Sequence, residues 1–303
     1  MQKRGGIKMK KENIFLKIWR VIYMPIVYFS ISFVIGIVAM IFIGILIGIE
    51  AGFSGGLDII EMEEQIYTLY YKYAMLFTVI AALITIPICY FLMKKDKKRE
   101  TIINGEVSYD KVGYKLYIPI VILGIASCIG VNNVITASRL IELFPGYLEI
   151  AEAIFGGGIL LQIISVVIIV PVLEELLFRG IVYKRLRGYL KVNIAIIISA
   201  LIFGVFHMNV VQGLYAFVIG LLVAFVYEKY KTIWAPIIFH VSANGVSIFL
   251  TEVIGEQSFF NNPIVFGVLT MVFLGLIVVI VMWIHKNINP TKKTLDRSVL
   301  ENV

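Results

Sequence analysis

The sequence predicts an all-α fold, a polytopic bundle of about eight transmembrane helices. Of its 303 residues, 60% are hydrophobic and 16% are charged, against roughly 25% charged residues in an average soluble protein. The mean hydropathy is +0.93, and several runs longer than about 18 residues carry no charge, which is typical of membrane-spanning helices. A water-soluble domain of this size could not cover so much apolar surface.

Eight apolar segments account for most of the chain, and each is predicted to form one span. A hydrocarbon core of about 30 Å requires roughly 20 helical residues. The fifth to seventh segments are somewhat short, which is tolerated where helices pack around a cavity. The first segment is too long for the core of a signal peptide, and the polar tail after His285 is expected to be disordered. The predicted spans cover approximately residues 21–49, 70–93, 114–136, 152–178, 191–208, 213–228, 232–250 and 263–285.

The connecting segments alternate in charge along the chain. Lysine and arginine dominate the N-terminus, the connections after the second, fourth and sixth spans, and the tail, whereas the other connections are acidic. Because cytoplasmic loops are enriched in Lys and Arg, this pattern predicts an integral membrane protein with both termini in the cytoplasm. We expect the membrane to be a bacterial cytoplasmic membrane. The net charge of +7 is attributed to this topology, so membrane lipids are expected as partners and nucleic acid is not.

Two glutamates and an arginine interrupt the fourth apolar segment, although a charge inside the bilayer costs roughly 2.5–3.5 kcal/mol. Glu175 and Arg179 are four residues apart, so they share a helix face and can pair. Glu174 is rotated by about 100° from Glu175, and Arg179 is therefore not placed to neutralise it. A carboxylate held in an apolar cavity away from cations is suited to act as a general acid or base near neutral pH. The alternative is that all three side chains lie at headgroup level.

Two of the three histidines of the chain lie in later apolar segments. His207 ends the stretch Phe203-Gly-Val-Phe-His207, and His240 is four residues before Asn244, so these two side chains project from one helix face. At 1.5 Å per residue, Glu174 and His240 lie about 15 Å from the nearest basic loop, whereas His207 lies about 24 Å along its helix. A helix tilt near 40° brings the groups together. We expect a site near mid-membrane that opens toward the cytoplasm.

These three motifs resemble those of the CPBP family, which includes the type II CAAX prenyl endopeptidases and the bacterial Abi proteins. That family carries EExxxR, FxxxH and HxxxN or HxxxD on successive transmembrane helices. Here the motifs read Glu174-Glu175-Leu-Leu-Phe-Arg179, Phe203-Gly-Val-Phe-His207 and His240-Val-Ser-Ala-Asn244, with matching order and intervals. The resemblance covers about residues 155–250.

The resemblance implies an intramembrane endopeptidase in which Glu174 activates water and His207 orients that water or shares its proton. His240 and Asn244 would stabilise the oxyanion, and Glu175 with Arg179 would hold the helix in place. The implied substrate is a membrane-associated peptide or a lipidated protein tail, and no cofactor is implied. The implied organisation is three N-terminal spans in residues 1–150, a catalytic core of four helices in 151–255, and the last helix with a cytoplasmic tail in 256–303.

Three other interpretations of the same residues remain open. Glu174, His207 and His240 could be ligands of a zinc ion, which would then activate the water. Intramembrane carboxylates and histidines also mark proton pathways in ion-coupled transporters, although the sequence shows no repeated halves. A non-catalytic immunity protein could keep the same bundle without turnover.

Overall fold

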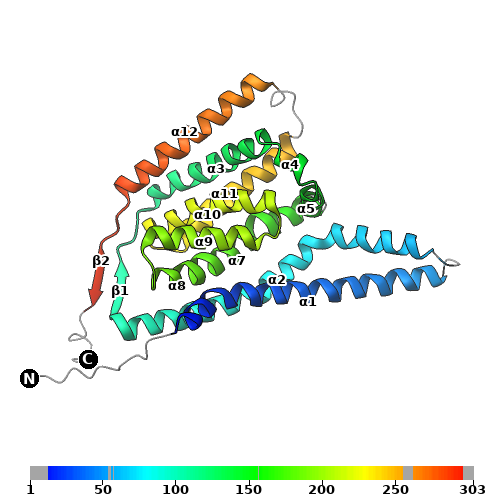
Figure 1. The fold of residues 1–303 in the computed structure, drawn as a ribbon, viewed down its shortest axis with the longest axis horizontal. Coiled ribbons are helices and arrows are strands. Elements are labelled where there is room, and N and C mark those ends of the chain that lie inside the picture. Colours follow the sequence, from blue (N-terminus) through cyan, green and yellow to red (C-terminus); the bar gives the residue numbers. More distant parts are fainter. Residues whose placement is uncertain (1–12, 54–55, 57, 156, 255–261, 296–303) are drawn as a thin grey trace, which may run out of the picture.

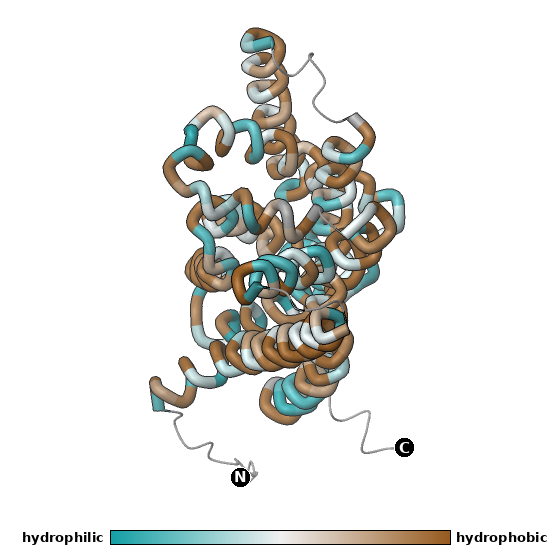
Figure 2. The backbone as a smooth tube through the Cα atoms, turned by 90° about the vertical axis from the view of Figure 1, so that its right-hand side faces the viewer, coloured by the Kyte–Doolittle hydropathy of each residue, from teal (hydrophilic) through white to brown (hydrophobic). Residues whose placement is uncertain are grey.

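The computed structural model describes residues 13–53, 56, 58–155, 157–254 and 262–295, and it confirms the predicted all-α membrane bundle. Within these residues, seven helices are long and apolar enough to cross a bilayer. Large apolar side chains such as Phe42, Val272 and Met271 are more than half exposed, and Figure 2 shows hydrophobic residues along most of the helices. A surface of this kind is stable in lipid rather than in water, so the chain is an integral membrane protein.

The first two helices, α1 (Ile14–Phe53) and α2 (Ile59–Asn104), form an antiparallel pair that extends past the rest of the bundle (Figure 1). They contain 40 and 46 residues, which corresponds to lengths of about 60 and 70 Å. The predicted spans 21–49 and 70–93 are therefore only the apolar parts of longer helices. Asp58 begins α2, because its carboxylate accepts the N–H of Ile59 at 2.7 Å and satisfies one free donor of the first turn.

The remaining helices pack beside this pair. The helices α10, α11, α3 and α12 lie side by side, in that order, across the bundle (Figure 1). One continuous segment, Ile159–Arg187, packs between these helices and α2. Along the chain this segment consists of α6 (Ile159–Gln162), the π-helical η2 (Ile163–Ile169), α7 (Val170–Glu175), the π-helical η3 (Leu176–Tyr183) and α8 (Lys184–Arg187). The other elements are η1 (Tyr114–Tyr117), α3 (Ile118–Ala137), α4 (Leu140–Leu143), α5 (Gly146–Phe155), α9 (Val192–Phe206), α10 (Val210–Tyr230), α11 (Trp234–Phe249), the π-helical η4 (Leu250–Ile254) and α12 (Pro263–Asn287).

The predicted fifth span, 191–208, is shorter in the structure than a full crossing. It forms α9, which has 15 residues and a length of about 22 Å. The chain reverses after α9 because Met208 adopts a left-handed backbone conformation, with φ of 55°. Asn209 then caps α10 by accepting the N–H groups of Val211 and Gln212. Of the eight expected spans, seven thus have full length and one ends inside the bundle.

A second correction concerns the C-terminal tail, part of which is ordered. Strand β2 (Lys292–Leu295) pairs antiparallel with β1 (Glu106–Tyr109), and Tyr109 lies opposite Lys292. This pair, the start of α1, the end of α2 and α8 lie at one end of the bundle, which we call the basic end (Figure 1). The helices α4 and α5 lie at the opposite end, which we call the α5 end.

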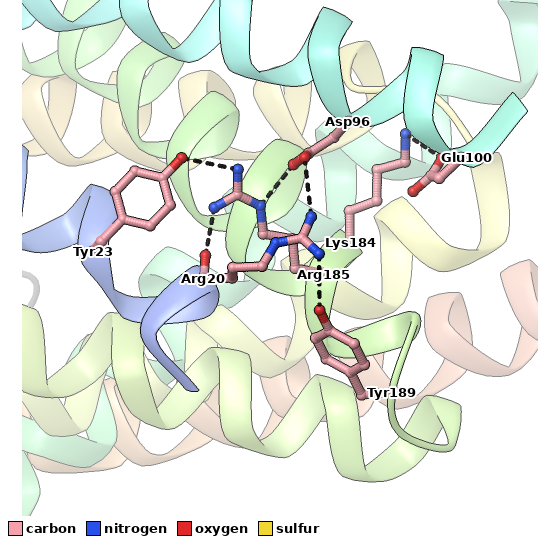
Figure 3. A network of polar contacts seen from close by, with 7 residues as sticks. All are labelled: Arg20, Tyr23, Asp96, Glu100, Lys184, Arg185 and Tyr189. Carbon is pink, nitrogen blue, oxygen red and sulfur yellow. Dashed lines mark hydrogen bonds and ion pairs between the residues drawn. The ribbon is translucent and has the colours of Figure 1, made fainter. Parts of the chain in front are cut away.

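A polar network at the basic end fixes the α1–α2 pair to the segment Ile159–Arg187 (Figure 3). Arg185 donates to Asp96 at 2.6 Å, to the hydroxyl of Tyr23 at 3.1 Å and to the backbone carbonyl of Arg20. The side chain of Arg20 reaches the same carboxylate at 3.4 Å and the hydroxyl of Tyr189 at 3.2 Å. Because these groups come from α1, α2, α8 and the connection that follows it, they join helices that are distant in the sequence.

We predict that Gly124→Ala lowers the stability of the bundle. A Cβ at this position would lie 2.5 Å from the carbonyl oxygen of Phe239, so α3 and α11 would have to separate at a cost of about 1–3 kcal/mol. Thermal unfolding of the purified protein in detergent measures the effect. Gly267→Ala in α12 is the control, because no atom lies within 4 Å of its Cβ. Equal midpoints for the two variants would contradict close packing of α3 on α11.

Candidate active site

Glu174 and Glu175 lie in α7, between the two π-helical stretches η2 and η3. π-Helical turns are rare in proteins, and those that occur often lie at functional sites. A π-helical turn contains one residue more than an α-helical turn, so it changes the direction in which the following side chains point. The carboxylate pair therefore lies on a short α-helical stretch that has an irregular, π-helical stretch on each side.

A proline explains how the helix beside these carboxylates is held. In η2 the N–H of Val170 donates five residues back, to the carbonyl of Ser165. The next donor in this pattern would serve the carbonyl of Val166, but that position is Pro171, which has no N–H. Asn244 of α11 supplies the missing donor, since its Nδ2 lies 2.8 Å from the Val166 oxygen. An amide from another helix thus satisfies a backbone carbonyl that would otherwise lack a partner in the membrane.

Glu175 is completely buried and binds two partners through one oxygen. Its Oε1 accepts from Nη1 of Arg179 at 2.9 Å, which confirms the predicted pair, and from Nδ1 of His240 at 2.8 Å. The contact with His240 was not predicted. A histidine whose Nδ1–H is bound by a carboxylate has a fixed ring orientation, with Nε2 pointing away. Glu175 therefore positions His240 as well as its own helix.

Arg179 is also fully buried, and it joins three elements. Its Nη2 donates to the backbone carbonyl of Gly220 in α10 at 3.3 Å, and its guanidinium lies 4.5 Å from the centre of the Phe203 ring. The same ring meets those of His207 and His240 edge-on, at centroid distances of 4.9 and 6.2 Å. Phe203, predicted as a supporting residue, thus contacts the arginine and both histidines.

Glu174 points away from Arg179 and into a cavity, as the helix geometry predicted. Its side chain is 14% exposed, and its Oε2 lies 3.6 Å from Nε2 of His240. The imidazole therefore lies between the two carboxylates and presents one nitrogen to each. Glu174 is the carboxylate that remains accessible from the cavity.

His207 ends α9 and lines the same cavity. Its Nδ1 lies 2.8 Å from the carbonyl oxygen of Phe203, so Nδ1 carries the proton and Nε2 is left for the cavity. His207 and Glu174 thus line one cavity, although sequence spacing placed them at different depths along their helices.

The cavity has a volume of about 250 Å³ and brings together Glu174, His207, His240 and Asn244. Its other walls come from the halves of α2, α3 and α10 nearer the α5 end, and from α5 itself, for example Thr78, Asn132, Gln212 and Tyr147. The cavity therefore extends from Glu174 toward the α5 end. The expected opening toward the cytoplasm stays a prediction, because sequence spacing gives depth along each helix but not the side on which helices leave space.

Within the described part of the chain, no three His, Cys, Asp or Glu side chains are close enough to hold a metal ion. The imidazole of His240 is oriented by Glu175, and the described contacts place only this ring between carboxylates.

We predict that Glu175→Leu alone destabilises the protein by about 3–5 kcal/mol, because it leaves the Arg179 guanidinium buried without its carboxylate. The double variant Glu175→Leu with Arg179→Met removes both charges and should recover most of this loss. Thermal unfolding in detergent compares the three proteins. A double variant no more stable than the single one would show that the buried charge is not the cause.

Comparison with known proteins identifies similar membrane peptidases. Residues 156–246 match the model of the family "Type II CAAX prenyl endopeptidase Rce1-like". The chain is also 30% identical over 160 residues to the "Putative membrane peptidase YdiL" of Bacillus subtilis (strain 168), an alignment that covers 50% of this chain and 62% of the relative. The match thus spans less than two thirds of that relative's length. No solved structure matches the chain significantly.

The matched region contains all the residues that the three motifs predicted for the site, from Glu174 on α7 to Asn244 on α11. The resemblance stated from the three motifs is thereby confirmed. Residues 156–246 of this membrane protein thus resemble the type II CAAX prenyl endopeptidase Rce1-like family.

Proposed function

We propose that the protein is an intramembrane endopeptidase in which Glu174 activates a water molecule. The observation that carries the proposal is a cavity inside the bundle into which one accessible carboxylate and two imidazoles project. Hydrolysis of an amide requires a base for water and fixed donors where negative charge develops. The family match and the peptidase-named relative point to the same reaction.

In the proposed reaction, Glu174 takes a proton from water as the water oxygen attacks the carbonyl carbon of the substrate. The tetrahedral intermediate carries its negative charge on the former carbonyl oxygen. Glu174 then returns the proton to the amide nitrogen, the C–N bond breaks, and a carboxylic acid and an amine leave. One side chain thus serves first as base and then as acid.

The environment of His240 suits it to the stabilisation of charge. Its Nδ1–H donates to Glu175, so its Nε2 can donate a hydrogen bond only when the ring is protonated. A protonated ring carries an N–H group on both nitrogens. In this form Nε2–H is directed toward Glu174 and the space where the oxyanion would form. Glu175 therefore supports the proposed role of His240 by fixing the orientation of its ring.

His207 and Asn244 take different parts in this scheme. Because Nδ1 of His207 donates to the Phe203 carbonyl, Nε2 of the neutral ring accepts, and it suits the orientation of a water molecule. Asn244 donates one amide N–H to the Val166 carbonyl, and its second amide N–H can donate to the oxyanion. The asparagine is thus a positioning residue for η2 in addition to its proposed contact with the substrate.

The proposed substrate is a peptide or lipidated protein tail whose scissile bond reaches the cavity from the α5 end. Apolar residues of four helices form much of the wall, including Ile135, Ile154, Val170 and Ile219. Such a wall suits an apolar segment within the membrane, and the few polar groups converge at Glu174. The proposal includes a metal-free mechanism, which the absence of a three-ligand cluster among the described residues supports.

We further propose a bacterial cytoplasmic membrane as the location, with the basic end in the cytoplasm. The start of α1, the β1–β2 pair and α8 all lie at that end (Figure 1), in agreement with the charge alternation along the chain. The cavity would then extend toward the extracytoplasmic side.

We predict that Glu174→Gln reduces peptide cleavage at least about 100-fold, because loss of a general base typically costs 10²–10⁴ in rate. Purified protein in liposomes is incubated with a library of lipidated and amphipathic peptides, and the products are identified by mass spectrometry. Glu142→Gln, at an exposed carboxylate of α4, is the control and should cleave normally. The wild type should stay active in the presence of a chelator. If a chelator abolishes activity and zinc restores it, the metal-free mechanism is wrong. If Glu174→Gln cleaves as fast as Glu142→Gln, Glu174 is not the base.

Orientation has a separate test that does not depend on activity. The two native cysteines, Cys89 and Cys128, are buried, so a new surface cysteine can be labelled selectively. We predict that a membrane-impermeant maleimide labels Glu142→Cys at the α5 end in intact cells. Lys293→Cys at the basic end should react only after permeabilisation. The reverse pattern would overturn the proposed orientation.

A further inference from the structure

A second cavity lies at the basic end, and it shares no lining residue with the cavity at Glu174. Its volume is about 680 Å³. Its walls come from the end of α2, the β1–β2 pair, the end of η3 with α8, and the end of α10. The segment Ile159–Arg187 thus contributes Glu174 to one cavity and its last turns to the other. The nearest wall residue on that segment, Tyr183, is about 14 Å along the helix from Glu174.

Positive charge dominates this second cavity. Five of its lining side chains are basic and two are acidic, and the acidic ones are already paired. Glu100 binds Lys184 at 2.9 Å, and Glu228 binds Lys231 at 2.6 Å and Arg187 at 3.5 Å. The remaining two basic side chains, Lys97 and Lys292, are exposed and form no ion pair with any residue that the structure describes.

The second cavity also has the chemistry of a membrane interface. Its wall includes Tyr109, Tyr183 and Tyr227, and tyrosine is enriched where helices leave the hydrocarbon core. The Tyr183 hydroxyl donates to Glu228 at 2.8 Å, and this hydrogen bond helps to keep the carboxylate close to Lys231 and Arg187. Basic pockets between transmembrane helices on the cytoplasmic side suit phosphate-bearing headgroups. Free phosphate compounds share this chemistry, but a cavity at the end of a bundle of apolar helices adjoins the lipid headgroups.

We propose that this cavity binds the phosphate headgroup of an anionic phospholipid, with Lys97 and Lys292 as its principal cationic contacts. Lys97 lies on α2 and Lys292 on β2, so one headgroup would join the second helix of the chain to its C-terminal strand. The same headgroup would adjoin Lys184 and Arg187 on the segment that carries Glu174. Bound lipid would therefore stabilise the fold at the basic end, whether or not the protein is a peptidase.

The test compares the wild type with the double variant Lys97→Gln, Lys292→Gln. The control is a double variant of equal charge change, Lys115→Gln with Lys286→Gln, since neither residue lines the second cavity. Each protein is purified in neutral detergent and titrated with phosphatidylglycerol, and separately with phosphatidylcholine and with glycerol 3-phosphate. Native mass spectrometry measures bound lipid, and thermal unfolding measures stabilisation.

Phosphatidylglycerol should bind and stabilise the wild type and the control more than phosphatidylcholine does. In the cavity variant its affinity should fall roughly 30-fold, from the loss of two lysine contacts. Because neither lysine forms an ion pair in the described structure, all proteins should unfold at the same temperature without lipid. Equal binding to the cavity and control variants would overturn the proposal, as would equal binding of phosphatidylcholine. Stabilisation by glycerol 3-phosphate but not by phosphatidylglycerol would overturn the lipid as the ligand.

Discussion

The structure of the site depends on one buried carboxylate, that of Glu175. Arg179 and His240 meet at the same oxygen of this group, and Arg179 continues to the backbone of α10 and the ring of Phe203 on α9. A charge so far from water persists only when partners surround it, so the four helices that supply these partners must assemble together. Because these helices assemble around Glu175, His240 lies beside Glu174. The position of Glu174, the carboxylate that is accessible from the cavity, therefore follows from helix packing.

A second constraint is the helix that carries both carboxylates. Pro171 removes one backbone donor next to a π-helical turn, and the lipid environment offers no water to replace it. The side-chain amide of Asn244 on α11 donates the missing hydrogen bond. The segment with Glu174 and the helix with His240 are therefore joined by two contacts, this amide and the carboxylate of Glu175. Irregular helix geometry at membrane depth is thus stabilised by the side chains that also line the cavity. A distortion of either contact would move Glu174 and His240 relative to each other.

Much of the fold was predictable from local patterns. Length and apolarity indicate a helical membrane bundle, because an isolated backbone in lipid must satisfy its own hydrogen bonds within helices. The four-residue spacing from Glu175 to Arg179 predicted their ion pair, since such residues are adjacent on any α-helix. The three spaced motifs identified Glu174, His207, His240 and Asn244, all of which line one cavity. The full length of α1 and α2 was missed, because polar turns of these helices extend beyond the apolar runs.

Only the tertiary structure decided how these residues are used. Contacts such as His240 with Glu175, or Asn244 with the Val166 carbonyl, join residues 65 and 78 positions apart, and no periodicity in the sequence relates such positions. The pairing of β2 with β1, the shortness of α9 and the direction of the cavity also depend on how helices pack against each other. The sequence by itself determined which chemical groups lie in the membrane and at what depth along each helix, because helix geometry is local. Packing determined which groups face each other, because orientation between helices arises from contacts that form only when the chain has folded.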